Sequence, residues 1–264
     1  MNLRPGWRHL APWFVPASLL LLWQLASSAF YSSSLVLPAP TAVASTLWEL
    51  AVSGELWAHS WASIVRLSLG GMLGVGTGIV AGLIAGRNAT IAALARPLVG
   101  FFSGISGVAW IPIAFVWFGT GTVMTTFILW NAVFFIVFVN TAQGVTQVHP
   151  IYENAIRTMG GGRLRVMAGA VIPGALPSIL TGTRVAMGFA WRSLIAAEML
   201  GATLGLGQLI FSAMPWQRTD TMLAGAITIG VLGTLFDRYV LEVIERRTVQ
   251  RWGMVSAVGL QAGA

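Results

Sequence analysis

Long apolar segments, separated by short arginine-bearing stretches, make up most of this chain. Each segment is close to the roughly 20 residues that a helix needs to cross the hydrocarbon core of a membrane. The pattern therefore predicts about six transmembrane helices, over residues 11–30, 63–85, 97–118, 123–142, 176–200 and 222–243. The expected fold class is all-α, a polytopic membrane protein with one domain over residues 1–264.

A further helix is predicted between the first two apolar segments, after Pro40. Thr41 is a suitable N-cap, because its hydroxyl can accept from a free backbone N–H. Trp48, Trp57 and Trp61 follow, and tryptophan rings favour the boundary between membrane and water. We therefore expect this helix to lie at the membrane surface.

The second apolar segment contains a regular series of glycines, spaced four residues apart. Small residues at this spacing share one helix face and let another backbone approach closely in lipid. The series predicts a tight helix–helix contact, and an interface that moves during transport is the alternative. The glycines are Gly70, Gly74, Gly78, Gly82 and Gly86.

The composition excludes a soluble protein. The chain is 56% hydrophobic and only 9% charged, whereas a soluble domain carries about 25% charged residues. It has no cysteine, and all 15 basic residues are arginine. A P-loop uses lysine to reach the β- and γ-phosphates of a nucleotide, so any ATP that drives this protein is expected on another subunit.

The arginines alternate between the two sides of the predicted bundle. Cytoplasmic loops of membrane proteins are enriched in arginine and lysine. This places both termini and the loops after the second and fourth segments in the cytoplasm. The positive charge is thus explained by membrane topology, so lipid rather than nucleic acid is the expected partner. A cleaved signal peptide in place of the first helix is the alternative. The arginines on this side include Arg4, Arg8, Arg87, Arg96, Arg157, Arg163, Arg165, Arg238, Arg246, Arg247 and Arg251.

Few charges lie within the apolar segments, and such charges usually face a protein interior or a water-filled path. Arg192 is a candidate for lining the path of an anionic solute, together with Arg184 and Glu198. The alternative for Arg192 is a structural ion pair with Glu198 of a neighbouring subunit. Arg66, near the outer end of its segment, is expected to have a structural role, and its side chain is long enough to extend toward the membrane surface.

Residues 154–177, NAIRTMGGGRLRVMAGAVIPGALP, form a basic, glycine-broken stretch between two apolar segments. The stretch resembles the cytoplasmic coupling loop of ABC importer permeases. In this chain, the loop is expected at about 144–176. In that family a short coupling helix docks into a groove of the ATPase subunit. Asn154 stands where the family has an acid, and Glu153 could supply that carboxylate. The resemblance implies a coupling helix at about 152–162, with ATPase contacts from Glu153, Asn154, Ala155, Arg157, Gly160 and Pro173.

Most of the chain resembles the nitrate, sulfonate and taurine branch of these permeases, and the opening segment and GELWAH look most like aliphatic-sulfonate permeases. The resemblance implies the type I importer fold and a bacterial inner-membrane location. It also implies a permease homodimer, two cytoplasmic ATPase subunits and a periplasmic or lipid-tethered solute-binding protein. ATP and Mg²⁺ would be bound by the ATPase subunits, with no cofactor on this chain. Pro173 and Pro177 would turn the chain into the fifth span, since proline lacks the N–H that a helix interior uses.

Two other classes of protein are alternatives to this expectation. A secondary transporter driven by ions usually places ionisable residues near the membrane midplane, often in repeated halves. Here Glu198 is the one plausible carboxylate, and no internal repeat is evident. A membrane-embedded enzyme is disfavoured, because the sequence contains no G-x-S-x-G elbow and no metal-binding motif.

Overall fold

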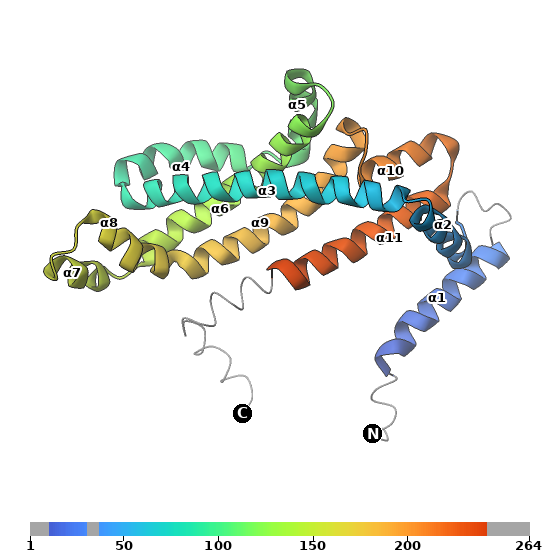
Figure 1. Ribbon diagram of the computed structural model, residues 1–264, viewed down its shortest axis with the longest axis horizontal. Coiled ribbons are helices and arrows are strands. Elements are labelled where there is room, and N and C mark those ends of the chain that lie inside the picture. Colours follow the sequence, from blue (N-terminus) through green and yellow to red (C-terminus); the bar gives the residue numbers. More distant parts are fainter. Residues whose placement is uncertain (1–10, 31–36, 242–264) are drawn as a thin grey trace.

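The computed structural model describes residues 11–30 and 37–241, and every regular element in these ranges is helical. Figure 1 shows an elongated bundle in which α1 is set apart from the other helices. The α-helices are α1 (Ala11–Phe30), α2 (Pro40–Val52), α3 (Glu55–Arg87), α4 (Ala89–Ser103), α5 (Ile111–Phe118), α6 (Thr122–Gln147), α7 (Pro150–Thr158), α8 (Arg163–Val166), α9 (Ile172–Gly201), α10 (Leu206–Ala213) and α11 (Thr219–Phe236). Short 3₁₀ turns occupy Gly107–Trp110 and Met214–Trp216, and π-helical turns occupy Met167–Val171 and Asp237–Leu241.

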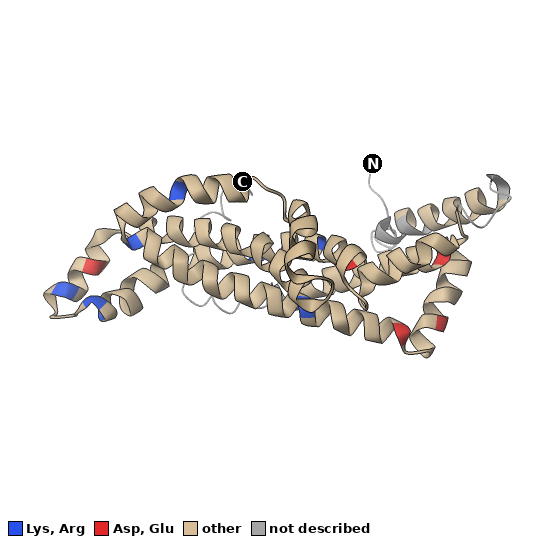
Figure 2. Ribbon diagram, turned by 90° about the horizontal axis from the view of Figure 1, so that it is seen from above, with Lys and Arg blue, Asp and Glu red and all other residues tan. Residues whose placement is uncertain are grey.

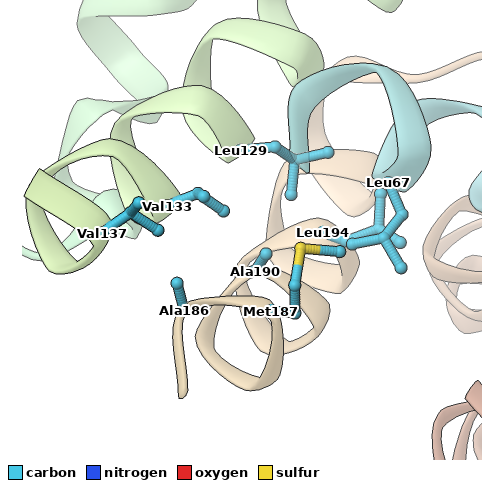
Figure 3. Packing of buried hydrophobic residues seen from close by; sticks show 8 residues of the cluster. All are labelled: Leu67, Leu129, Val133, Val137, Ala186, Met187, Ala190 and Leu194. Carbon is cyan, nitrogen blue, oxygen red and sulfur yellow. The ribbon is translucent and has the colours of Figure 1, made fainter. Parts of the chain in front are cut away.

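The centre of the bundle is formed by α3, α6 and α9. Their facing side chains make one buried apolar cluster, which Figure 3 shows from close by. Lipid is as apolar as these side chains, so van der Waals contact rather than exclusion of water holds the three helices together. The cluster consists of Leu67, Leu129, Val133, Val137, Ala186, Met187, Ala190 and Leu194.

The glycine series packs α3 against α6, which confirms the predicted tight contact. A Cβ built on Gly74 would lie 2.6 Å from the Cβ of Val133, and one on Gly82 would lie 2.6 Å from the Cβ of Thr141. Real Cβ atoms essentially never approach so closely. Each glycine faces an α6 residue in a series that is also spaced four apart, so the two helices pack closely from Gly70 to Gly86. The α6 partners are Leu129, Val133, Val137, Thr141 and Val145.

Four continuous helical stretches in the described ranges are long and apolar enough to cross a membrane: Glu55–Arg87, Thr122–Gln147, Arg163–Gly201 and Thr219–Tyr239. They correspond to the second, fourth, fifth and sixth predicted spans. The helix at the second predicted span, Glu55–Arg87, is 33 residues long, or about 50 Å at 1.5 Å per residue. It is therefore longer than the hydrocarbon core, and it extends beyond the expected start at residue 63.

The prediction of a single helix for the third span was wrong. The span consists of α4 and a second piece, Gly107–Phe118, which meet at an angle of 84°. Ser106 between them has an extended backbone, with φ −56° and ψ 138°, and Gly104 and Gly107 flank it where helix propensity is poor. Hydropathy did not reveal the bend, because the whole stretch is apolar.

The fifth predicted span also differs from its expected form. The prolines were expected to turn the chain, but Pro173 lies in the first turn of α9 and Pro177 lies inside it. The helical path continues without a sharp bend from Arg163 to Gly201. The π-helical turn Met167–Val171 directly precedes Pro173, and such turns help a helix to accommodate a proline that has no N–H to donate.

The N-terminal helices fit the sequence analysis in part. α1 occupies the predicted range, and its described apolar stretch, Ser18–Ser28, is shorter than a membrane span. α2 forms after Pro40 as predicted, but Thr41 does not cap it. The N-cap is Ala39, which makes no side-chain hydrogen bond, and Pro40 occupies the first turn. Proline suits this position because its missing N–H would have no helical partner there. The last residues of the sixth predicted span lie outside the described ranges.

Candidate functional site

The predicted coupling segment forms a separate short helix, α7, at one end of the bundle (Figure 1). Pro150 occupies its first turn, and the imidazole of the N-cap residue His149 accepts a hydrogen bond from the backbone N–H of Ile151 at 3.3 Å. A fixed proline φ and a side-chain cap both favour a helix start. The expected helix at 152–162 thus exists, beginning two residues earlier and ending at Thr158.

Three consecutive glycines end α7 with a Schellman motif. The N–H of Gly161 donates to the carbonyl of Ile156 at 2.9 Å, and the N–H of Gly160 donates to Arg157 at 3.0 Å. This pattern needs a left-handed residue just past the helix, and Gly160 has φ +79°. A Cβ on Gly161 would collide with Ile156 at 2.5 Å. The glycines therefore make the tight reversal that sends the chain into α8.

Glu153 fastens α7 to the end of α3. One of its carboxylate oxygens accepts from the guanidinium of Arg87, the last residue of α3. The other lies 3.7 Å from the guanidinium of Arg157, one turn later on α7. The Glu153 side chain is only 15% exposed. It thus faces the bundle, and its predicted contact with an ATPase subunit stays a prediction.

The opposite face of α7 is open. Asn154 and Ala155 are exposed there, whereas Ile156 packs inward beside the π-helical turn. Arg157 is also exposed, but it lies on the side of Glu153, its ion-pair partner. Apolar side chains on α7 and just after it are exposed as well, and such patches often mark protein–protein contacts. These apolar residues are Ile151, Tyr152, Met159 and Leu164.

Pro173 does not belong to this surface. It lies at the start of α9, beyond α8 and the π-helical turn. The structure therefore brings four of the six predicted contact residues onto α7 and Gly160 to the turn that ends it, and separates Pro173 from them. The contact roles of all six stay predictions.

Glu198 lies in a buried network rather than on an open path. Its carboxylate accepts from the Arg66 guanidinium at 2.9 Å and from the Ser63 hydroxyl at 2.8 Å. The backbone N–H of Gly207, in the first turn of α10, donates to its other oxygen at 3.0 Å. Glu198 is 0% exposed and Arg66 is 6% exposed. Arg66 is thus paired inside the protein and does not extend to the membrane surface.

The loop between α9 and α10 is shaped around this carboxylate. Gly205 has φ +148°, and a Cβ there would lie 2.5 Å from the Glu198 carboxyl carbon. The Nδ1 of buried His59 lies 2.6 Å from the Gly205 carbonyl oxygen. The Arg66 guanidinium also donates to the carbonyl of Leu204. The network joins α3, α9 and α10, and it satisfies most of the polar groups that the interior would otherwise penalise.

The Arg66–Glu198 pair was not predicted, although the positions of the two residues within their predicted spans indicate a similar depth in the membrane. Each lies within a few residues of the outer end of its predicted span. A buried charge that lacks a partner on its own helix needs one at the same depth. The suggestion that Glu198 pairs with Arg192 of a neighbouring subunit is wrong, because Glu198 is fully buried against Arg66 of the same chain.

The other two predicted path residues lie apart from this network. Arg192 is exposed, and its guanidinium carbon lies 5.7 Å from the ring centroid of Phe189. Arg184 lies 3.3 Å from a carboxylate oxygen of Asp237. Arg184, Arg192 and Glu198 share α9 but have different surroundings, so they do not form one cluster.

Comparisons with known proteins give matches over most of the chain. The family model for the binding-protein-dependent transport system inner membrane component matches residues 74–250. SsuC of Bacillus subtilis (strain 168), named for aliphatic sulfonates transport, is 31% identical over 247 residues, covering 94% of this chain and 88% of that protein. The taurine transport system permease protein TauC of Escherichia coli (strain K12) is 32% identical over 244 residues, covering 90% and 88%.

A solved structure has the same fold. The MetNI methionine ABC transporter in inward-facing conformations aligns with a TM-score of 0.65, covering 75% of this chain and 98% of that chain. Its sequence identity is 17%, so this likeness concerns the arrangement of the helices alone.

Proposed function

Since this chain belongs to the family of binding-protein-dependent transport system inner membrane components, the permeases of ABC importers, we propose that it imports a small anionic solute into the cytoplasm. The solute would be of the aliphatic-sulfonate, taurine or nitrate type. Two relatives at 31% and 32% identity are named for transport of sulfonates and of taurine, and taurine is itself a sulfonate. This agreement supports the proposed solute class.

The exposed face of α7 is the observation that carries the mechanism. It presents Asn154 and Ala155 outward, with exposed Arg157 at its edge beside Glu153, while Glu153 and Ile156 attach the helix to the bundle. We propose that a groove of an ATPase subunit grips this face. Movement of the ATPase pair would then pass to α3 through the Glu153–Arg87 ion pair, and to α9 through the contacts of Ile156.

The proposed assembly contains two copies of this chain, two cytoplasmic ATPase subunits and a periplasmic or lipid-tethered solute-binding protein. ATP and Mg²⁺ would be bound on the ATPase subunits, because the chain has no lysine for a P-loop. Both termini and α7 would face the cytoplasm, where positively charged loops are favoured. The protein itself is a multi-pass component of the inner membrane.

Arg192 is proposed to line the solute path. Its guanidinium is exposed beside Phe189 and makes no ion pair within the described residues. A positively charged side chain of a membrane protein that makes no ion pair is suited to bind an anion in a water-filled passage. Glu198 has a different proposed role: it holds α10 in place beside that passage through its contacts with Arg66 and Gly207.

Reconstitution in liposomes tests the proposal. The chain, its ATPase and its solute-binding protein would be assembled with and without ATP, and uptake of an alkanesulfonate would be measured. Ala155→Arg on the open face of α7 should abolish ATP-dependent uptake. Ala44→Arg, the same change at an exposed position on α2, is the matched control and should retain it. Uptake that ignores both ATP and the α7 variant would instead indicate a secondary transporter.

A further inference from the structure

A groove of about 340 Å³ lies between α4, the end of α3 and the second half of α6. None of the residues of α4 is buried within the described chain, so this helix packs loosely against its neighbours. A Cβ built on Gly100, which lines the groove, would meet nothing within 4 Å. The groove is therefore unfilled space between helices, in the half of the bundle that carries α7 (Figure 1).

The walls of the groove are mostly apolar. Ala85 of α3 and Ala142 of α6 contribute small side chains, and Phe138 of α6 closes the inner side as a buried ring. Val99 and Gly100 of α4 line the other side. Hydrocarbon chains of lipids are as apolar as these side chains, so the groove is suited to an acyl chain.

Two polar side chains without partners line the same groove. Arg96 of α4 and Gln143 of α6 are exposed, and neither side chain makes a hydrogen bond or ion pair within the described residues. A guanidinium carries five N–H donors and no acceptor, and a glutamine amide adds two more donors. Such donors bind the oxygens of a phosphate group, and the charge of arginine strengthens the contact.

The position of Arg96 in the sequence indicates its depth in the membrane. It directly precedes residues 97–118, the apolar stretch predicted as the third span. Long side chains on a helix point back toward its N-terminus, which for α4 is the end next to α3 and the α7 side of the bundle. The guanidinium is thus expected at the level of the lipid headgroups, while the apolar walls continue toward the membrane interior.

We propose that this groove binds an anionic phospholipid. Its phosphate would contact Arg96 and Gln143, and part of one acyl chain would lie against Val99 and Gly100. Basic pockets between transmembrane helices bind anionic headgroups in this way. The lipid would come from the cytoplasmic leaflet, an assignment that rests on the orientation given under the proposed function.

Charge favours a lipid over a second copy of this chain in the groove. Figure 2 shows mostly basic segments at the end that carries α7 and acidic segments at the opposite end. A second copy at the same depth in the membrane would therefore bring positive charge toward Arg96. An anionic headgroup supplies the counter-charge that the described residues do not give this arginine.

Lipid retention by the whole chain tests this proposal. The protein would be purified in detergent, given equal amounts of phosphatidylglycerol and phosphatidylcholine, and analysed by native mass spectrometry. The first lipid retained should be the anionic one by about fivefold. Arg96→Gln should abolish this preference, whereas Arg96→Lys keeps the charge and should retain most of it. The same preference in Arg96→Gln as in the wild type would overturn the proposal.

Gly100 provides a steric test with a matched control. Gly100→Leu places a side chain in the open groove and should lower the retention of phosphatidylglycerol about fivefold or more. Gly76→Leu makes the same change at an exposed position of α3, away from the groove, where a Cβ also meets nothing within 4 Å. This control should retain lipid as the wild type does, and both variants should elute normally on size-exclusion chromatography. Equal retention by the two variants would show that no acyl chain enters the groove.

Two further results would overturn the inference. If Arg96→Gln separates two copies of the chain, the groove is an interface between copies. If free ethanesulfonate, an anion without an acyl chain, displaces the retained lipid, the groove is a solute site. Retention is measured without ATP, so absent ATP-dependent uptake would count against the proposed function alone. Normal uptake by a protein without the lipid preference would overturn only this inference.

Discussion

The Arg66 guanidinium and the Glu198 carboxylate meet at 2.9 Å, although 132 residues separate them along the chain. Arg66 comes from the N-terminal half of α3 and Glu198 from the last turn of α9. Gly207 of α10 completes the contact through its backbone N–H. One ion pair thus joins three helices at a depth where a lone charge would be unfavourable.

Neutralising only one member of this pair should destabilise the protein. Glu198→Gln leaves the Arg66 guanidinium buried without a counter-charge, a change that costs about 3–5 kcal/mol in other buried pairs. Heating the detergent-purified protein, followed by size-exclusion chromatography, would show a lower apparent melting temperature.

The paired change Arg66→Met with Glu198→Gln is the control. It removes both charges and keeps an oxygen that can accept from Gly207, so much of the lost stability should return. If the stability lost in the double variant equals the sum of the losses in Arg66→Met alone and Glu198→Gln alone, the two residues do not act as a pair.

Two glycines on α3 should respond to alanine in opposite directions. A Cβ on Gly82 would lie 2.6 Å from the Thr141 Cβ and 2.8 Å from the Phe138 carbonyl oxygen, whereas one on Gly76 would meet nothing within 4 Å. Gly82→Ala should therefore destabilise the protein by about 1–3 kcal/mol through overpacking. Gly76→Ala should be neutral or stabilising by up to about 1 kcal/mol, since alanine is the better helix former. Equal melting temperatures for the two variants would contradict the packing of α3 on α6.

The turn that ends α7 provides another matched pair. Gly160 has φ +79° and Gly162 has φ −74°, so only the first needs a conformation that side chains disfavour. Gly160→Ala should cost roughly 1–2 kcal/mol locally and loosen the end of α7, whereas Gly162→Ala should have little effect. Hydrogen exchange of the α7 amides would report the loosening, and uptake should fall with it. Unchanged exchange in the Gly160 variant would show that the Schellman motif does not stabilise α7.

Arg192 should affect transport more than folding. Its side chain is exposed and contacts the Phe189 ring, so Arg192→Ala should leave the melting temperature almost unchanged. If it attracts an anionic solute, the solute concentration for half-maximal uptake should rise about tenfold, equivalent to about 1.4 kcal/mol. Arg192→Lys should restore part of this loss because it keeps the charge. Normal uptake combined with a dissociating assembly would assign Arg192 a structural role.

The candidate site was predictable to different degrees. The glycines after residue 159 and the proline before residue 151 mark the ends of α7 in the sequence itself, because these residue types act on the local backbone. The inward direction of Glu153 was not predictable, since it depends on Arg87 at the end of another helix. The partner of Arg66 was likewise not predictable, because a single helix cannot show which other helix supplies it.

Hydropathy, arginine distribution and glycine spacing determined the class of this protein, the positions of most spans and the tight face of α3. Each of these depends on residues near one another in the chain. The tertiary structure decided the 84° bend within residues 89–118, the Arg66–Glu198 pair and the groove between α4 and α6. These depend on backbone geometry that hydropathy does not record, or on contacts between distant helices. Such contacts become defined only when the helices pack together.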